Sequence, residues 1–372
     1  MLMDKRVNQK SNQSGSPNYE TGRPPSALNR YTLAGLILLL IAIFFLDLSV
    51  GSVRIPAQDI IGMLFGKEPQ QAAWLKILYM FRLPKAITAV LAGAALAVSG
   101  LIMQTLFRNP LAGPFVLGIN SGASLGVALV ILWTGSMSQT TIFAGLGLIG
   151  DLGLIIAAGL GASLVLVFIL LVSRRVQNVM TLLILGLLFG YATSAVVSIL
   201  LHFSIAERIH LFVSWTFGSF GGVTWKQLKV LMPVLLIGIF ISQMLIKPLN
   251  SFLLGESYAR SMGLNVRRAR IWIICITALL AGSVTAFCGP IAFVGVAIPH
   301  LARSLFNTSD HRVLIPSVAL LGAIIAIVAD IVSGLPGTQV VLPLNAVTSL
   351  IGAPIIAWII LSRRNLRKTF AS

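Results

Sequence analysis

The chain has 372 residues, of which 57% are hydrophobic and only 10% are charged. Because about a quarter of the residues in a soluble domain are charged, this composition excludes a soluble fold and is typical of an integral membrane protein. The net charge of +17 does not indicate nucleic-acid binding, because the Lys and Arg residues lie in short clusters between apolar runs.

Apolar runs recur along the whole chain, and a helix that crosses a bilayer needs about 20 apolar residues. Lipid offers no hydrogen-bond partner to the backbone, so we expect helices. A further half-helix at the interface is expected at residues 207–222, whereas residues 51–81 are polar and mixed. The sequence predicts an all-α protein with about ten transmembrane helices, at residues 33–46, 86–107, 116–133, 143–172, 180–201, 230–246, 271–287, 291–305, 314–330 and 344–361.

The two ends of the chain are polar. Residues 1–30, rich in Asn, Ser, Gly and Pro, predict a disordered cytoplasmic tail, residues 31–362 the transmembrane domain, and residues 363–372 a basic cytoplasmic tail. Ten spans place both termini on one side of the membrane. With the termini in the cytoplasm, most of the 27 Lys and Arg residues also lie there, as the positive-inside rule requires.

A charged segment separates the sixth and seventh apolar runs and is too polar to cross a bilayer. Leu254, Tyr258 and Met262 recur four residues apart, so they share one helix face. Gly255 and Gly263 flank this piece. The pattern predicts a short amphipathic helix on the cytoplasmic surface that presents a ridge to a partner protein. A basic loop that only fixes the topology is the alternative, and the pattern alone does not decide between them.

A weak internal repeat links the two halves of the chain. The triplet Leu91–Gly93 recurs at Leu280–Gly282, and Pro110 recurs at Pro299. The second and seventh spans cross the membrane in opposite directions, so the pattern predicts an inverted repeat, which is common in transporters. Compositional bias towards small residues is the alternative.

Catalytic chemistry has little support in the sequence. Residues 62–67 resemble a phosphate-binding loop, but the glycine spacing is wrong and Glu68 stands where Ser or Thr would bind Mg²⁺. Cys275 and Cys288 lack metal-ligand spacing and are expected to be small buried hydrophobes. His300 is expected to pack or to form hydrogen bonds. We therefore predict no catalytic residue, no metal site and no ATP hydrolysis by this chain.

Acidic residues inside a membrane usually indicate ion coupling. Only Asp151 falls within a long apolar run, whereas Asp47 and Asp330 lie at the outer ends of their spans. An ion-driven secondary transporter normally needs more, so it remains the weaker hypothesis. Energy supplied by a separate protein that acts on the charged segment is the stronger one.

Several long motifs in order resemble the FecCD-type permeases of binding-protein-dependent ABC importers, which include iron–siderophore, haem and vitamin B12 permeases. The resemblance covers nearly everything from residue 33 to residue 361. The motifs are Arg82-Leu83-Pro84-Lys85, AGAALAVSGLIMQTLFRNPLAGPFVLGINSGASLG (92–126), LGESYARSMGL (254–264), GPIAFVGVAIPHLAR (289–303) and LIGAPIIAWII (350–360).

The resemblance implies the type II ABC importer permease fold in a bacterial cytoplasmic membrane. It implies a second permease subunit, identical or related, an extracytoplasmic substrate-binding protein, and two cytoplasmic ATPase subunits that bind ATP and Mg²⁺. This chain itself would hold no cofactor. Ferric siderophore is the first expected substrate, and haem and cobalamin are the alternatives.

The resemblance also implies three sets of site residues. The coupling segment, 249–270, would contact the ATPase through Leu254, Gly255, Glu256, Tyr258, Ala259, Arg260, Met262, Gly263 and Leu264. Arg82 and Lys85 match the positions that bind the substrate-binding protein; a role in topology or lipid headgroup binding is their alternative. Some relatives add an Arg where this chain has Ser333-Gly334, and Arg54 is the expected substitute for it. An inner gate would lie at Asn178, Val179, Met180 and Thr181, and the pathway along Gly186, Gly190, Thr193, Ser194 and Ser198, unless these serve only close helix packing.

Overall fold

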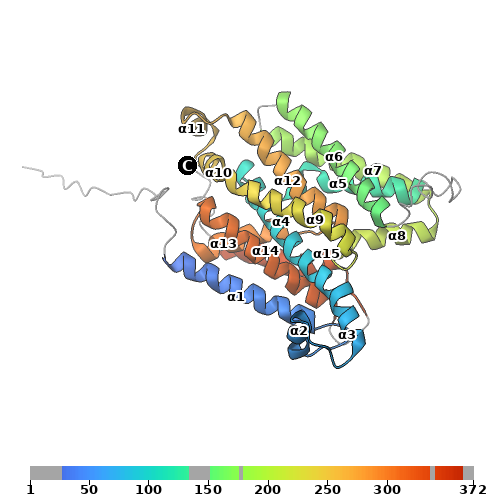
Figure 1. The fold of residues 1–372 in the computed structure, drawn as a ribbon. Coiled ribbons are helices and arrows are strands. Elements are labelled where there is room, and N and C mark those ends of the chain that lie inside the picture. The colour runs from blue at the N-terminus through green and yellow to red at the C-terminus, as the bar shows by residue number, and fades with distance from the viewer. Residues whose placement is uncertain (1–26, 134–150, 176–178, 336–339, 363–372) are drawn as a thin grey trace, which may run out of the picture.

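The computed structural model describes residues 27–133, 151–175, 179–335 and 340–362. Within these ranges every regular element is a helix, and Figure 1 shows the helices packed side by side in one bundle. Seven of them are long and apolar enough to cross a membrane, and three shorter apolar helices accompany them. Together they correspond to the ten predicted spans, so the predicted all-α membrane fold is confirmed.

Most consecutive helices of the described residues are joined by short connections. In the first half they are α1 (Ala27–Ser49), α2 (Ala57–Leu64), α3 (Ala72–Lys76), the π-helical η1 (Ile77–Arg82), α4 (Leu83–Leu106), η2 (Pro114–Leu117), α5 (Ile119–Ala128), η3 (Leu129–Trp133), α6 (Asp151–Arg175) and α7 (Val179–His202). In the second half they are α8 (Ala206–Thr216), α9 (Trp225–Met244), α10 (Ile246–Leu253), α11 (Glu256–Ser261), α12 (Val266–Cys288), α13 (Val294–Phe306), α14 (His311–Ser333) and α15 (Leu344–Ser362).

The centre of the bundle is α4, which packs against α14, α12, α13 and α9. Its many small residues allow this, because helices in lipid associate through close backbone contact. Gly93 is an example: a Cβ atom there would lie 2.2 Å from the carbonyl oxygen of Gly322 on α14. The α4–α14 pair is therefore one of the close backbone contacts of the described bundle, and Lys85 and Asp330 both lie on it.

The helix contacts follow the predicted repeat. In the first half α4 packs against α14 and α13; its counterpart α12 packs against α6 and α5. The pairs α5–α7 and α13–α15 also correspond. Gly93 faces α14, and its counterpart Gly282 faces Ala162 of α6. Each half thus completes the core of the other, which argues against compositional bias as the source of the repeat.

Two local expectations need correction. The stretch 51–81 is not merely polar, because it forms α2 and α3 around a small core of its own that includes Ile60, Met63, Trp74 and Leu78. Both helices are too short for a hydropathy signal. The N-terminal tail ends earlier than predicted, because α1 begins at Ala27 and not after residue 30. Residues 1–26 and the basic tail 363–372 lie outside the described residues.

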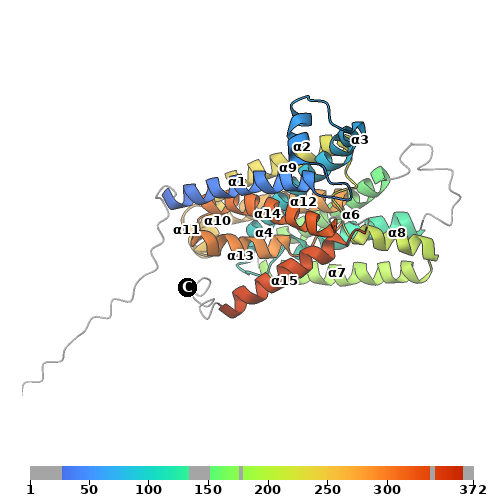
Figure 2. The same cartoon turned by 90° about the horizontal axis from the view of Figure 1, so that it is seen from below.

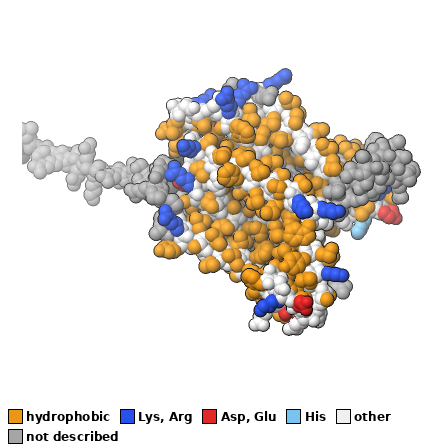
Figure 3. All heavy atoms as spheres, viewed as in Figure 1, with side chains coloured by type: hydrophobic (Ala, Val, Ile, Leu, Met, Phe, Trp, Pro, Cys, Tyr) orange, Lys and Arg blue, Asp and Glu red, His pale blue; other side chains and the backbone are white. Residues whose placement is uncertain are grey.

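The surface suits a membrane. The face in Figure 3 is covered mainly by hydrophobic side chains, with Lys and Arg towards its edges. Helix α1 begins at the end of the bundle where α10 and α11 lie, as Figures 1 and 2 both show, and Figure 2 shows that α15 ends there too. We call this the α11 end. The opposite end, where α1 finishes and α2 and α3 lie, is called the α2 end. The predicted half-helix is present there as α8.

Candidate functional site: the α11 end and the α2 end

The coupling segment folds as two short helices joined by glycine turns. Gly255 has a φ of +104° and Gly263 a φ of +83°, conformations that side chains with a Cβ rarely adopt. They begin and end α11. The next helix, α12, starts cleanly because the side chain of Asn265 accepts a hydrogen bond from the backbone N–H of Arg268 at 3.0 Å. The segment is therefore an ordered structure and not a slack loop.

The predicted ridge is exposed. Leu254, Tyr258 and Met262 are 37%, 52% and 61% exposed, whereas Ala259 on the opposite face is completely buried. Leu264 is half-buried. The expected contact set therefore divides into an outward ridge, which also includes the exposed Arg260, and inward residues that hold the segment on the bundle.

A hydrogen-bonded ion pair fixes this orientation. Arg270 of α12, 4% exposed, reaches Glu256 at the start of α11, with 2.8 Å between Nη2 and Oε1. The arginine side chain is buried and the glutamate side chain is 30% exposed, and a hydrogen bond between two such charged groups adds geometric specificity. The family resemblance implied Glu256 as a contact residue but did not predict this pairing, although an arginine directly before the seventh apolar run was a signal for it.

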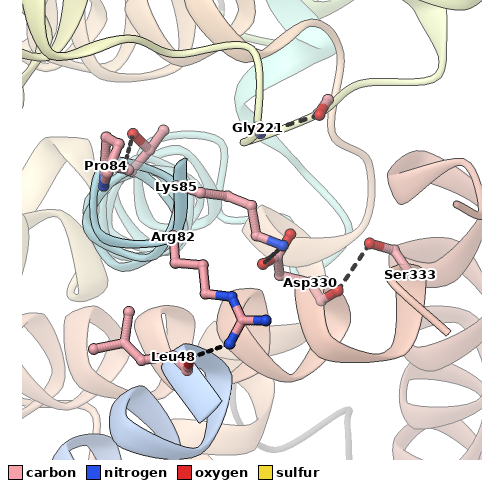
Figure 4. A network of polar contacts seen from close by, with 9 residues as sticks. Leu48, Arg82, Pro84, Lys85, Gly221, Asp330 and Ser333 are labelled. Atoms are coloured by element: carbon pink, nitrogen blue, oxygen red, sulfur yellow. Dashed lines mark hydrogen bonds and ion pairs between the residues drawn. The ribbon is translucent and has the colours of Figure 1, made fainter. Parts of the chain in front are cut away.

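The cations at the α2 end are held inside the molecule. Arg82 and Lys85 lie three residues apart, so both leave the same side of the helix, as Figure 4 shows. Lys85 Nζ lies 2.8 Å from Asp330 Oδ2 of α14. Arg82 donates hydrogen bonds to the backbone carbonyls of Leu48, in the last turn of α1, and of Val53, in the loop that follows.

The same side chains line a pocket of about 560 Å³ together with Asp47 and Phe220. Asp330 and Asp47 are 4% and 5% exposed. Arg54, in contrast, is exposed on the loop that follows α1. The position of the additional arginine in some relatives, Ser333-Gly334, also lines this pocket. The sequence reasoning noted Asp330 only as an acid near the outer end of its span; a buried acid at such a place needs a cationic partner, and Lys85 supplies it.

The predicted pathway residues of α7 do not form one wall. A Cβ atom at Gly186 would lie 2.4 Å from the carbonyl oxygen of Val116, so this face packs closely on η2. Thr193 is 4% exposed and lies on the packed side. Ser194 and Ser198 are exposed. The packing alternative therefore describes Gly186 and Thr193, and only the two serines face away from the bundle.

The remaining pathway and gate residues also divide into packed and exposed positions. A Cβ atom at Gly190 would lie 3.3 Å from Ser121 Oγ, so this residue also approaches a neighbouring helix. At the start of α7, Met180 is 54% exposed and Thr181 is half-buried. Asn178 lies outside the described residues, and the side chain of Val179 is not described.

Other residues that the sequence singled out have structural roles. His300 Nε2 lies 2.7 Å from the carbonyl oxygen of Pro110, which confirms the hydrogen-bonding role. Cys288 is buried and Cys275 is half-buried. Asp151 is the first residue of α6, so it does not lie in the middle of a described helix.

The fold and these two ends define a class: a multi-pass helical membrane transport subunit with an ordered surface segment at one end and a charged pocket at the other. The chain belongs to the FecCD transport family, whose model matches residues 38–362. Permeases of this family are transport subunits of ABC importers and not enzymes.

Named relatives agree with this assignment. The chain is 36% identical to a vitamin B12 import system permease protein BtuC of Klebsiella pneumoniae over 90% of this chain and 95% of that one. It is 37% identical to a BtuC of Salmonella paratyphi A over 76% and 83%, respectively. A solved inward-facing conformation of a putative metal-chelate type ABC transporter superposes with a TM-score of 0.77 at 28% identity, covering 90% of this chain and 99% of that chain.

Proposed function

We propose that this chain is the permease subunit of a binding-protein-dependent ABC importer that carries a metal chelate across the bacterial cytoplasmic membrane. It pairs with a second permease subunit, two ATPase subunits and an extracytoplasmic binding protein, and both its termini lie in the cytoplasm. The observation that carries the proposal is the ordered coupling segment, whose ridge of Leu254, Tyr258 and Met262 is exposed on the surface of the bundle.

The ridge supports ATPase contact for a physical reason. Tyr258 and Met262 are 52% and 61% exposed in a segment too polar to enter lipid, so neither the bundle nor the bilayer covers them. Exposed aromatic and Met side chains at the centre of a patch are typical of protein interfaces. The bond between Arg270 and Glu256 keeps the ridge facing outward.

Ferric siderophore is the first substrate candidate, since it is the commonest cargo that the family resemblance implies. Cobalamin is the second, and one observation favours it: the two relatives described above are vitamin B12 permeases. Both cargoes are large metal chelates, and haem remains a third member of this class. The pathway would run between two permease copies, along the exposed serines of α7.

The binding protein is proposed to dock at the α2 end through acidic residues. Arg54 is exposed, whereas Lys85 is paired with Asp330 and Arg82 with two carbonyl groups. An incoming carboxylate therefore competes with Asp330 for Lys85. Docking at this end is expected to depend on salt concentration, because screening weakens such attraction.

Uptake into proteoliposomes tests the proposal. The chain would be reconstituted with the ATPase and binding protein encoded beside it, and uptake of ferric siderophore, cobalamin and haem would be measured with and without ATP. We expect uptake of one chelate only with ATP. Uptake that persists without nucleotide and stops when the ion gradient is collapsed would overturn the proposal in favour of a secondary transporter.

Substitution of the ridge tests the ATPase contact separately. We expect the double variant Tyr258→Glu and Met262→Glu to insert normally and to lose nearly all ATPase in affinity co-purification, because two charges would replace the apolar centre of the contact. Phe65→Glu is the matched control, since Phe65 is 84% exposed at the α2 end. Equal ATPase recovery with the ridge variant and the control would contradict the docking assignment.

A further inference from the structure

A buried histidine joins the coupling segment to the centre of the bundle. His311 is the first residue of α14 and is 1% exposed. Its ring lies between Asn250 of α10 and Thr105 of α4, with Nδ1 2.7 Å from Asn250 Oδ1 and Nε2 2.8 Å from Thr105 Oγ1. One side chain therefore bonds three helices, two of which belong to the tight α4–α14 pair.

The hydrogen positions in this junction follow from the donors. The backbone N–H of His311 lies 3.0 Å from Asn250 Oδ1, and a backbone N–H can only donate, so that atom is the amide oxygen. It then also accepts from Nδ1–H. In the neutral ring Nε2 carries no hydrogen, so it accepts from the hydroxyl of Thr105. The three side chains thus form a directed chain of bonds.

The junction is anchored on both sides. Asn250 also donates to Asp310 Oδ1 at 2.8 Å, and that carboxylate caps α14 by accepting from the backbone N–H of Arg312. On the α4 side, the neighbour of Thr105, Gln104, accepts from Arg303 of α13 at 2.7 Å. Movement of α10 relative to α4 or α14 would break these bonds inside the protein, where unpaired polar groups are costly.

Asn250 connects the junction to the coupling segment. Asn250 lies on α10, and only Leu254 and Gly255 separate that helix from α11. Apolar helix faces can slide past one another, whereas hydrogen bonds keep a fixed distance and direction. At the opposite end the same helix pair is joined by Lys85 and Asp330. Side-chain contacts therefore join α4 to α14 at both ends of the pair. At the α11 end, Asn250 also joins the coupling segment to this pair.

We propose that the junction of Asn250, His311 and Thr105 transmits displacement of the coupling segment to the α4–α14 pair, with His311 as a positioning residue. This inference rests on the proposed function, because the displacement comes from the ATPase. Removal of one bond leaves ATPase binding intact, since the exposed ridge is unchanged, but loosens the connection to the helices that must move. The specific consequence is uncoupling: ATP is hydrolysed with less transport.

The decisive variant is Thr105→Val, which removes the hydroxyl and keeps the shape. Thr88→Val is the matched control: Thr88 is also buried in α4, and each hydroxyl lies within hydrogen-bonding distance of the carbonyl four residues earlier, Pro84 at 2.7 Å and Leu101 at 3.0 Å. Only Thr105 also reaches another helix. The measured quantity is substrate transported per ATP hydrolysed in proteoliposomes that contain the whole complex.

We expect Thr105→Val to lower this ratio at least about fivefold, the low end for coupling between sites, with unchanged ATPase co-purification. Thr88→Val should retain the wild-type ratio, and Thr105→Ser, which keeps the hydroxyl, should restore it. Asn250→Leu breaks the same junction from α10 and decides the question if Thr105→Val does not insert. An unchanged ratio, or an equal fall in the control, overturns the inference. Failure of the wild-type complex to transport would instead overturn the proposed function.

Discussion

The two ends of the α4–α14 pair hold the same helices together by different means. At the α2 end the bond is an ion pair, Lys85 with Asp330, beside a pocket and with the lysine side chain 32% exposed. At the α11 end the bond is a neutral hydrogen-bonded junction around His311, which is 1% exposed. A partly hydrated ion pair can exchange partners with an incoming charge, whereas a buried neutral junction holds its geometry. The first suits a docking surface and the second a mechanical connection.

The comparison of the two ends requires that α4 and α14 move as one unit. The largest loss of folded protein is therefore expected from a substitution that separates these two helices. Gly93→Val should abolish the folded protein, because its Cβ would lie 2.2 Å from the Gly322 carbonyl oxygen and packed backbones cannot yield that far. Size-exclusion chromatography of the detergent-extracted protein measures this. Gly35→Val on α1 is the control, since nothing lies within 4 Å of the added atom. A monodisperse Gly93→Val protein would show that the pair is not the frame of the fold.

A smaller effect is expected from releasing α11 alone. Arg270→Met removes the partner of Glu256, and loss of a charged hydrogen bond of this kind costs about 2 kcal/mol. We expect ATPase affinity to fall about tenfold while the protein still inserts. Arg268→Met, at an exposed position of the same helix, should have no such effect. Titration of the purified ATPase against the reconstituted permease gives the affinities. Equal affinities for the two variants would show that the ion pair between Arg270 and Glu256 does not control the orientation of the ridge.

The smallest effect is expected at the α2 end. Asp330→Asn frees Lys85 from its internal partner, so affinity for the binding protein should rise about threefold at low salt, within the range of partly exposed ion pairs. The rise should shrink as salt is added. Asp59→Asn on α2 removes a charge at the same end without touching Lys85 and serves as the comparison. A lower affinity after Asp330→Asn would mean that the ion pair supports docking and does not compete with it.

The sequence was sufficient to predict features that depend on a single helix. Spans are visible because lipid demands long apolar runs, and the ridge of Leu254, Tyr258 and Met262 is visible because residues four apart share a helix face. Contacts between distant helices were not visible. Lys85 and Asp330 lie in different halves of the chain, so the sequence did not reveal that this expected docking cation has an internal partner. Ala259 matched the family motif, but only packing shows that it points inward.

The helices α2 and α3 escaped prediction for a related reason. Each is too short to show a periodic pattern. Trp74 of α3 is buried in a cluster with Leu48 of α1 and with Ile60 and Met63 of α2, and these contacts form only in the fold. The Asn250–His311–Thr105 junction could not be predicted either. Its three members are ordinary polar residues, and only the fold brings them within bonding distance.

The two glycine turns around α11 have a consequence for how such a complex diversifies. Both joints are made by backbone alone, and inward contacts of the short helix are concentrated at Glu256 and Ala259. The outward face can therefore change its side chains without disturbing the membrane domain. In the proposed complex, the outward face of α11 is therefore an interchangeable interface. Transfer of its outer residues from a related permease should allow the chain to bind that permease's ATPase subunit while its substrate stays the same.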